Sequence, residues 1–180
     1  GPSNFGEYSV ALSVGAVLAI FIDGGMRKLL MRERTRPSPH LTHLFDLLPS
    51  IAFGHAFIVA LASSLIAITF FIDQIALALA MVWCFFAIVV AENISAMLRA
   101  EGRLELDAGW QMGQRCSSAG CIVLVTVLGF HSPWHILTSW ALGAQIMNLL
   151  FLFGFKFRPS FLFGFKFRPS LKFRSTLYKA

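Results

Sequence analysis

Long apolar runs separated by short polar segments make up most of this chain. A helix needs about 20 mostly apolar residues to cross the hydrocarbon core of a bilayer, and five of the runs approach that length. The pattern predicts an all-α fold, a polytopic membrane bundle of about five transmembrane helices. The expected spans cover residues 8–25, 47–72, 75–98, 110–130 and 133–155.

These spans form one predicted domain over residues 1–155, followed by a basic-aromatic tail over residues 156–180. The fourth span is the shortest, because only residues 116–130 are cleanly apolar. Residues 151–160 recur letter for letter as residues 161–170. The duplicated segment alternates Phe with Lys or Arg, so an extended chain would present its cations on one face, against anionic headgroups or a partner subunit.

The basic residues divide the predicted loops between two sides of a membrane. A basic hinge over residues 26–39 separates the first two spans, and Pro37 and Pro39 predict an extended turn at its end. With five spans, this hinge, the stretch over residues 99–115 and the tail share one side, which receives all 15 Lys and Arg residues. The opposite side receives only Glu7 and Asp73. Since Lys and Arg concentrate in cytoplasmic loops, we expect the N-terminus outside and the C-terminus inside.

Composition agrees with a membrane protein. Hydrophobic residues make up 57% of the chain and charged residues 13%, whereas a soluble domain carries about 25% charged residues. The net charge of +6 comes from the loops and the tail. Membrane insertion accounts for cations in those places, so no nucleic-acid partner is expected.

The cations of the hinge and tail are candidate contacts to anionic lipid, such as cardiolipin, and to other integral-membrane subunits of a complex. Anionic headgroups attract clustered Lys and Arg beside membrane helices. The candidates are Arg27, Lys28, Arg32, Arg34, Arg36, Lys156, Arg158, Lys166, Arg168, Lys172 and Arg174.

Glu92 and Asn93 are the polar residues placed deepest in an apolar run. An ionisable residue within a span is a candidate for proton relay or ion binding. Because Glu92 falls near the inner end of the third span, pairing with Arg99 or Arg115 is the simpler interpretation. Both interpretations remain open at this stage.

A second candidate site is formed by His40, His43, Ser50 and His55, which flank the start of the second span. Polar side chains at a membrane interface could bind a quinone or a lipid headgroup. No spacing of Cys, His or acidic residues predicts a metal centre. Haem is not expected either, because no further histidine lies on the same side.

The run Arg36-Pro37-Ser38-Pro39-His40-Leu41, followed by Ser50 and His55, resembles the start of the cytochrome-b subunit that anchors succinate dehydrogenase. That family has an Arg-Pro-x-Ser-Pro-His-Leu run before its first membrane helix and a Ser-x-x-His-Arg element in its quinone pocket. The resemblance implies a quinone site at these residues. It also implies an anchor without haem, because the family's haem ligand in the next helix has no counterpart in residues 75–98.

The chain lacks a phosphate-binding glycine loop, a metalloprotease His pair and a nucleophile elbow, so we do not expect an enzyme acting on its own. The leading hypothesis is a structural or accessory subunit of a respiratory-type electron-transport complex in the mitochondrial inner membrane, by analogy with subunits of similar make-up. A bacterial plasma membrane or a plastid membrane remains open. So do two other functions: a quinone-site anchor of a succinate dehydrogenase-like complex, and a small homo-oligomeric channel or transporter that uses Glu92.

Overall fold

The structure, a computed structural model, describes residues 2–35 and 47–154, and all long elements in these ranges are helices. Arg36, His40, His43 and the whole basic tail lie outside the described residues. The elements are α1 (Pro2–Asp23), α2 (Met26–Thr35), α3 (Leu48–Phe70), the short 3-10 helix η1 (Ile72–Gln74), α4 (Ile75–Ala100), α5 (Leu104–Val127) and α6 (Pro133–Gly154). The basic hinge therefore contains a helix, α2, which the apolar pattern did not predict.

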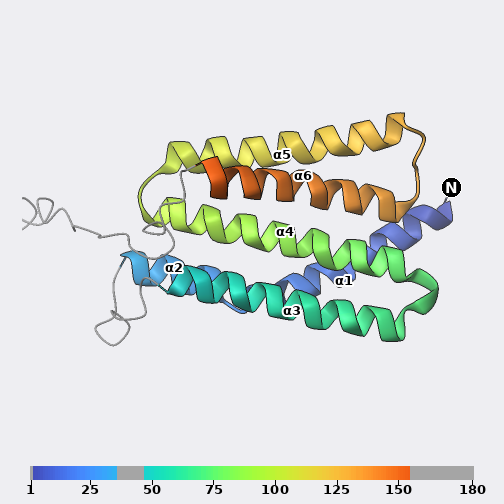
Figure 1. Cartoon of the computed structure of the whole chain (residues 1–180), viewed down its shortest axis with the longest axis horizontal. Helices are drawn as coiled ribbons and strands as arrows, with labels where there is room; N and C mark the ends of the chain where they lie inside the picture. The colour runs from blue at the N-terminus through green and yellow to red at the C-terminus, as the bar shows by residue number, and fades with distance from the viewer. Residues whose placement is uncertain (1, 36–46, 155–180) are drawn as a thin grey trace, which may run out of the picture.

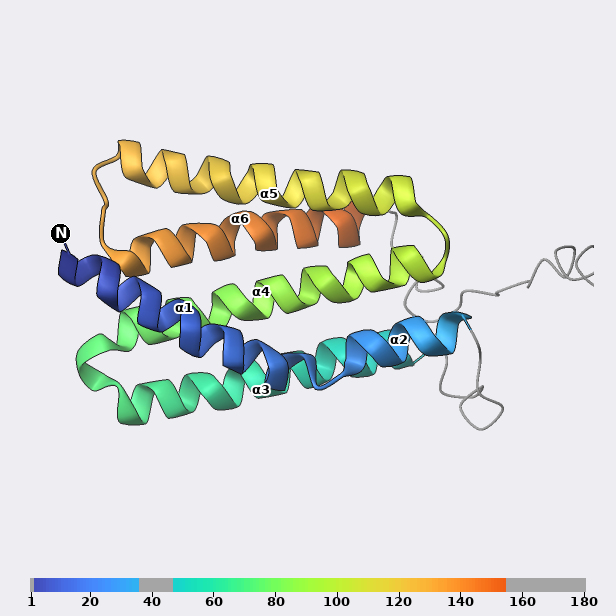
Figure 2. The ribbon, with the colours of Figure 1, turned by 180° about the vertical axis from the view of Figure 1, so that it is seen from behind.

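Helix α4 is the centre of the bundle, since it contacts each of the other α-helices. On one side of α4 lies α3, and on the other lies the antiparallel pair of α5 and α6 (Figure 1). The N-terminal half of α1 lies beside the α4–η1 end of the bundle, and α1 then crosses obliquely until α2 continues along α3 (Figure 2). The end of α2, the α4–α5 connection and the end of α6 all lie at the same end of the molecule (Figure 1).

Three segments within the described residues are long and apolar enough to cross a membrane: Phe5–Asp23, Leu48–Phe70 and Ile72–Ala100. Their outer faces carry exposed large hydrophobic side chains such as Ile20 and Leu65, which suits contact with lipid. The all-α fold of a helical membrane bundle is thus confirmed. The spans expected at residues 110–130 and 133–155, and the orientation of the termini, stay predictions.

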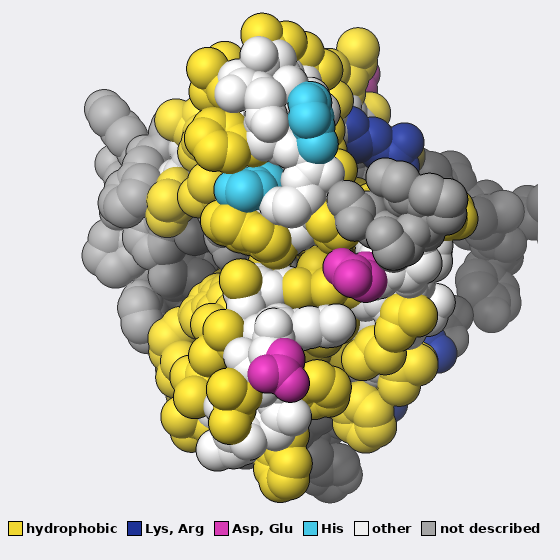
Figure 3. All heavy atoms as spheres, turned by 90° about the vertical axis from the view of Figure 1, so that its right-hand side faces the viewer, with side chains coloured by type: hydrophobic (Ala, Val, Ile, Leu, Met, Phe, Trp, Pro, Cys, Tyr) yellow, Lys and Arg dark blue, Asp and Glu magenta, His cyan; other side chains and the backbone are white. Residues whose placement is uncertain are grey.

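The two ends of the bundle differ in charge. The end that holds the N-terminus presents mainly hydrophobic, acidic and His side chains, and Lys and Arg appear only at its margin (Figure 3). Glu7 and Asp73 are exposed at this end. The described Lys and Arg residues lie on α2, in the last turn of α4, in the α4–α5 connection and in the first half of α5, toward the opposite end of the bundle.

Two apolar clusters fix α1 and α2 against α4. Near the N-terminal end, Ala11 of α1, Cys84 of α4 and Leu137 of α6 belong to one buried cluster. Near the other end, Leu30 of α2 and Met97 of α4 belong to a second cluster, together with residues of α3. Helix α2 is therefore held by apolar packing although more than half of its residues are charged or polar.

Helices α5 and α6 approach each other closely at Gly143. The Ser117 hydroxyl donates a hydrogen bond of 2.9 Å to the Gly143 carbonyl oxygen, and the Ser118 hydroxyl donates one of 3.3 Å to the Trp140 carbonyl oxygen. A side chain at Gly143 would collide with the backbone of Ser118. Small residues at a helix crossing allow such close backbone approach in membrane bundles.

We expect Gly143→Val to destabilise the bundle by about 1–3 kcal/mol, because the added atoms must force α5 and α6 apart. Thermal unfolding of the purified chain in detergent measures the effect. Gly120→Val is the matched control, since a carbon added at Gly120 of α5 meets no atom within 4 Å. The same loss of stability in both variants would contradict the proposed crossing.

Candidate functional site

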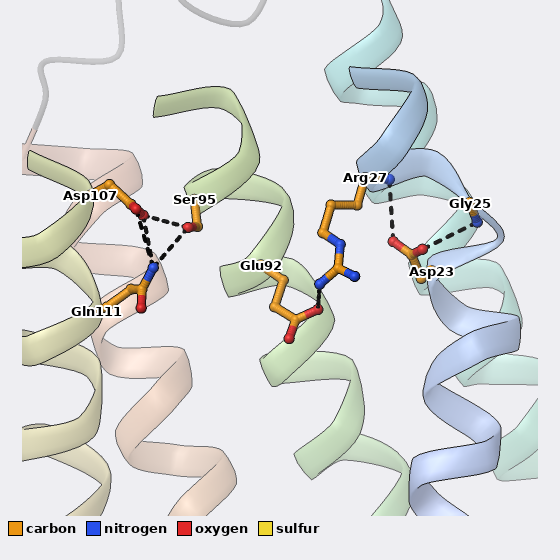
Figure 4. Close-up of polar contacts among 7 residues, drawn as sticks. All are labelled: Asp23, Gly25, Arg27, Glu92, Ser95, Asp107 and Gln111. Carbon is orange, nitrogen blue, oxygen red and sulfur yellow. Dashed lines mark hydrogen bonds and ion pairs between the residues drawn. The ribbon is translucent and has the colours of Figure 1, made fainter. Parts of the chain in front are cut away.

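A break in the first long helix positions the basic residues of α2. Gly24 and Gly25 have φ values of 54° and 77°, which glycine adopts without the steric penalty that other residues incur. The Asp23 carboxylate accepts hydrogen bonds from the backbone N–H groups of Gly25 and Arg27, each 3.2 Å long, and so caps α2 (Figure 4). The break starts α2 at Met26, and the first turn of α2 brings Arg27 to α4.

His55 of α3 supports this break. Its Nε2 atom lies 3.2 Å from the carbonyl oxygen of Phe21 in the last turn of α1. A side chain at Gly24 would collide with the His55 imidazole. The structure thus gives His55 a place at the junction of α1, α2 and α3.

Glu92 of α4 forms an ion pair with Arg27 of α2, in which Nη1 and Oε2 lie 2.6 Å apart (Figure 4). The sequence had suggested Arg99 or Arg115 as the partner of Glu92. That expectation is corrected, because α2 places Arg27 beside the middle of α4 and Arg99 pairs with Asp107 instead.

Polar contacts join α4 to α5 around the Asp107 carboxylate (Figure 4). The Arg99 Nε donates to Asp107 Oδ2 at 2.6 Å, and the Gln111 side-chain amide donates to both carboxylate oxygens at 3.1 and 3.2 Å. The Ser95 hydroxyl donates to Asp107 Oδ1. Burial alone would raise the pKa of Asp107, but these hydrogen bonds and the Arg99 charge hold that pKa below its usual value.

A cavity of about 630 Å³ is lined by α2, α4 and α5, with one residue from α6. It follows α4 from Ile88 to Arg99. Ile88 and Trp140 line it and also pack against the cluster that joins α1, α4 and α6, so that cluster bounds the cavity toward the N-terminal end. Its lining consists of Arg27, Lys28, Met31, Ile88, Ala91, Glu92, Ser95, Ala96, Arg99, Gln111, Gln114, Arg115, Ser118 and Trp140.

Cations outnumber carboxylates in this lining. The four cations Arg27, Lys28, Arg99 and Arg115 share the cavity with one carboxylate, that of Glu92. Within the described residues, Lys28 and Arg115 form no ion pair or hydrogen bond through their side chains. Lys and Arg bind phosphate through charge-assisted hydrogen bonds, so the cavity is suited to an anionic ligand.

Comparison with known families adds one finding. The family of polysaccharide biosynthesis proteins matches residues 1–178 of the chain. The chain belongs to this family. No curated protein and no solved structure matches the chain significantly. Family and apolar helices together describe a membrane protein of polysaccharide biosynthesis, and they give no support to a respiratory host.

In this polysaccharide biosynthesis protein, the cations predicted from the hinge fall into different environments. Arg27 and Lys28 line the cavity. Arg32 pairs with the buried Glu33 on its own helix, and Arg34 pairs with Glu101 at the end of α4. Burial raises the pKa of Glu101 in spite of the neighbouring Arg34 and Arg103 guanidiniums.

The other predicted site residues do not line the cavity. Ser50 is half-buried in the first turn of α3, and His55 lies at the helix break. Asn93 is fully buried on α4, and its side-chain amide has no hydrogen-bond partner among the described residues. The quinone site predicted around Ser50 and His55 stays a prediction, since its other members lie outside the described part of the chain.

Sequence reasoning missed the contribution of α5. Asp107, Gln111 and Arg115 recur at intervals of four residues, which places them on one helical face. The spacing of these three residues indicates a polar face on α5. The expected span began at residue 110, so Asp107 was assigned to a loop and separated from the other two residues.

We expect Asp107→Asn to destabilise the protein by about 1–3 kcal/mol at neutral pH, because Arg99 loses its charged partner. The folded-state pKa of Asp107 is depressed, so its ionised carboxylate stabilises the folded protein. This contribution to the unfolding free energy is complete above the unfolded-state pKa of about 3.9. It is lost as the pH falls through the folded-state pKa. The difference in unfolding free energy between wild type and variant should therefore shrink below about pH 4.

Denaturant unfolding in detergent over a pH series measures this difference. Asp73→Asn is the control, because Asp73 is exposed in η1 and has no ion pair among the described residues. A difference for Asp107→Asn that stayed constant down to the lowest pH would refute the assignment.

Proposed function

We propose that this protein is a membrane carrier component of polysaccharide biosynthesis, which binds the phosphate-bearing headgroup of a lipid-linked saccharide precursor in the cavity between α2, α4 and α5. The observation that carries the proposal is the pair of cations Lys28 and Arg115, which line the cavity from different helices and have no ion-pair partner among the described residues. Charges in such a place are costly without a counter-ion. A phosphate or diphosphate would supply one.

The neutral part of the lining suits the saccharide of such a ligand. Gln111, Gln114 and Ser118 offer amide and hydroxyl groups that can exchange hydrogen bonds with sugar hydroxyls. Trp140 offers an apolar face with a polar edge. The polar headgroup could thus lie in the cavity while the lipid chain remains among the apolar outer faces of the bundle.

The proposed function gives anionic lipid a different role from the one expected from the sequence. We expected a cardiolipin-like lipid to contact the surface of the bundle, whereas the proposed lipid-linked precursor is the ligand of the cavity. We favour the transporter alternative over a subunit that acts by packing alone, because Glu92 lines a charged cavity. A bacterial plasma membrane is the proposed location, since the family concerns polysaccharide biosynthesis.

Lys28→Ala and Arg115→Ala should each weaken the binding of a short-chain isoprenyl diphosphate by about tenfold, the effect of losing one hydrogen bond to a charged group. Isothermal titration of the purified chain in detergent measures the affinity. Neither side chain has a protein partner among the described residues, so folding should be unaffected.

Arg103→Gln serves as the control for loss of one positive charge at the same end of the bundle, because Arg103 does not line the cavity. The corresponding isoprenyl alcohol tests whether the diphosphate is required. Wild-type affinity in both cavity variants would refute the proposed function.

A further inference from the structure

We infer that the Glu92 carboxylate occupies, in the empty cavity, the place on Arg27 that a ligand phosphate takes when it binds. Glu92 is then an internal competitor of the ligand, and the bound anion displaces it from Arg27. This inference rests on the proposed function and adds a residue that controls affinity and release.

The Arg27–Glu92 ion pair lines the cavity and is accessible to a ligand. The side chains of Arg27 and Glu92 are 43% and 47% exposed, respectively, and both line the cavity. Among the described residues, Glu92 is the only carboxylate in that lining. A ligand anion that enters therefore meets Arg27 already engaged by one negative group.

The other two interhelical ion pairs differ from this one. Arg34 and Glu101 are 9% and 10% exposed, so breaking their pair would strand charges away from water. Asp107 is held by Ser95 and Gln111 in addition to Arg99. Within the described residues Glu92 has one side-chain partner, Arg27, so its release costs a single, hydrated contact.

Helix α2 can keep its position while the Arg27 side chain changes partner. The Asp23 carboxylate caps the backbone N–H of Arg27 whether or not the guanidinium is paired. The apolar cluster around Leu30 and the Arg34–Glu101 pair hold the rest of α2 to α4. The exchange is thus a local replacement of one anionic partner by another.

A competing carboxylate has a use in a carrier. In the empty state it partly neutralises Arg27, Lys28 and Arg115, whose mutual repulsion would otherwise be uncompensated. In the loaded state its return to Arg27 favours departure of the ligand. A transported ligand must bind well enough to enter and weakly enough to leave.

Glu92→Gln should bind the isoprenyl diphosphate at least about fivefold more tightly than wild type. The ligand then no longer has to break the Arg27–Glu92 pair, so the unfavourable coupling between this pair and ligand binding is removed. Glu105→Gln is the matched control, because Glu105 is exposed at the start of α5 and does not line the cavity. Its affinity should equal that of wild type.

A double-mutant cycle with Arg27→Ala separates competition from a general effect of charge. If Glu92 acts through Arg27, the increase in affinity caused by Glu92→Gln disappears in the Arg27→Ala background. An increase that persists there would overturn the inference, because it would arise from direct repulsion between the Glu92 charge and the ligand. Weaker binding by Glu92→Gln would also overturn it, since Glu92 would then contact the ligand.

Glu92→Asp provides a second variant that keeps the charge. The shorter side chain cannot maintain the 2.6 Å contact without movement of α2 or α4, so binding should tighten, though less than in Glu92→Gln. Unchanged affinity in both Glu92 variants, with weaker binding in Lys28→Ala and Arg115→Ala, would overturn the competition and leave the proposed function standing. Unchanged affinity in all four variants would overturn both.

Discussion

The free-energy cost of placing charge against apolar helices is the constraint on which this bundle depends. Two carboxylates at the contacts of α4 each form an ion pair with an arginine: Glu92 of α4 pairs with Arg27, and Asp107 of α5 pairs with Arg99. The first of these pairs links α2 to α4, and the second links α4 to α5. The break at Gly24–Gly25 precedes α2, the basic helix that contacts α4 and carries Arg27.

Apolar packing and charge contribute differently to the attachment of α2. Leu30 is almost completely buried in a cluster with Met97 and Ala52, and burial of such side chains stabilises by about 1.5–3 kcal/mol each. The nearby Arg34–Glu101 pair loses hydration on burial, as the raised pKa of Glu101 reflects, so its net contribution is small. The cluster supplies the stability, whereas the ion pair fixes where along α4 the helix lies.

The sequence predicted the long helices well because their apolar runs have the length that a bilayer demands, and α3 and α4 begin and end within a few residues of the expected ranges. It did not predict α2, because the four apolar residues of this helix, Met26, Leu29, Leu30 and Met31, stand among four cations. The cavity also escaped prediction. Its residues come from helices far apart in the chain, and the pairing of Arg27 with Glu92 spans 65 positions.

The structure separates cations that a topology argument treats as equal. Arg34 is buried in an ion pair, Arg32 is largely exposed, and Lys28 and Arg115 line a cavity without ion-pair partners among the described residues. Each of these cations counts once toward the positive side of the membrane, although their environments in the bundle differ. Like charges that line the same cavity repel one another, and a bound anion would relieve this repulsion. In the proposed function, the cavity therefore supplies both the space for the anionic headgroup and the positive charge that binds it.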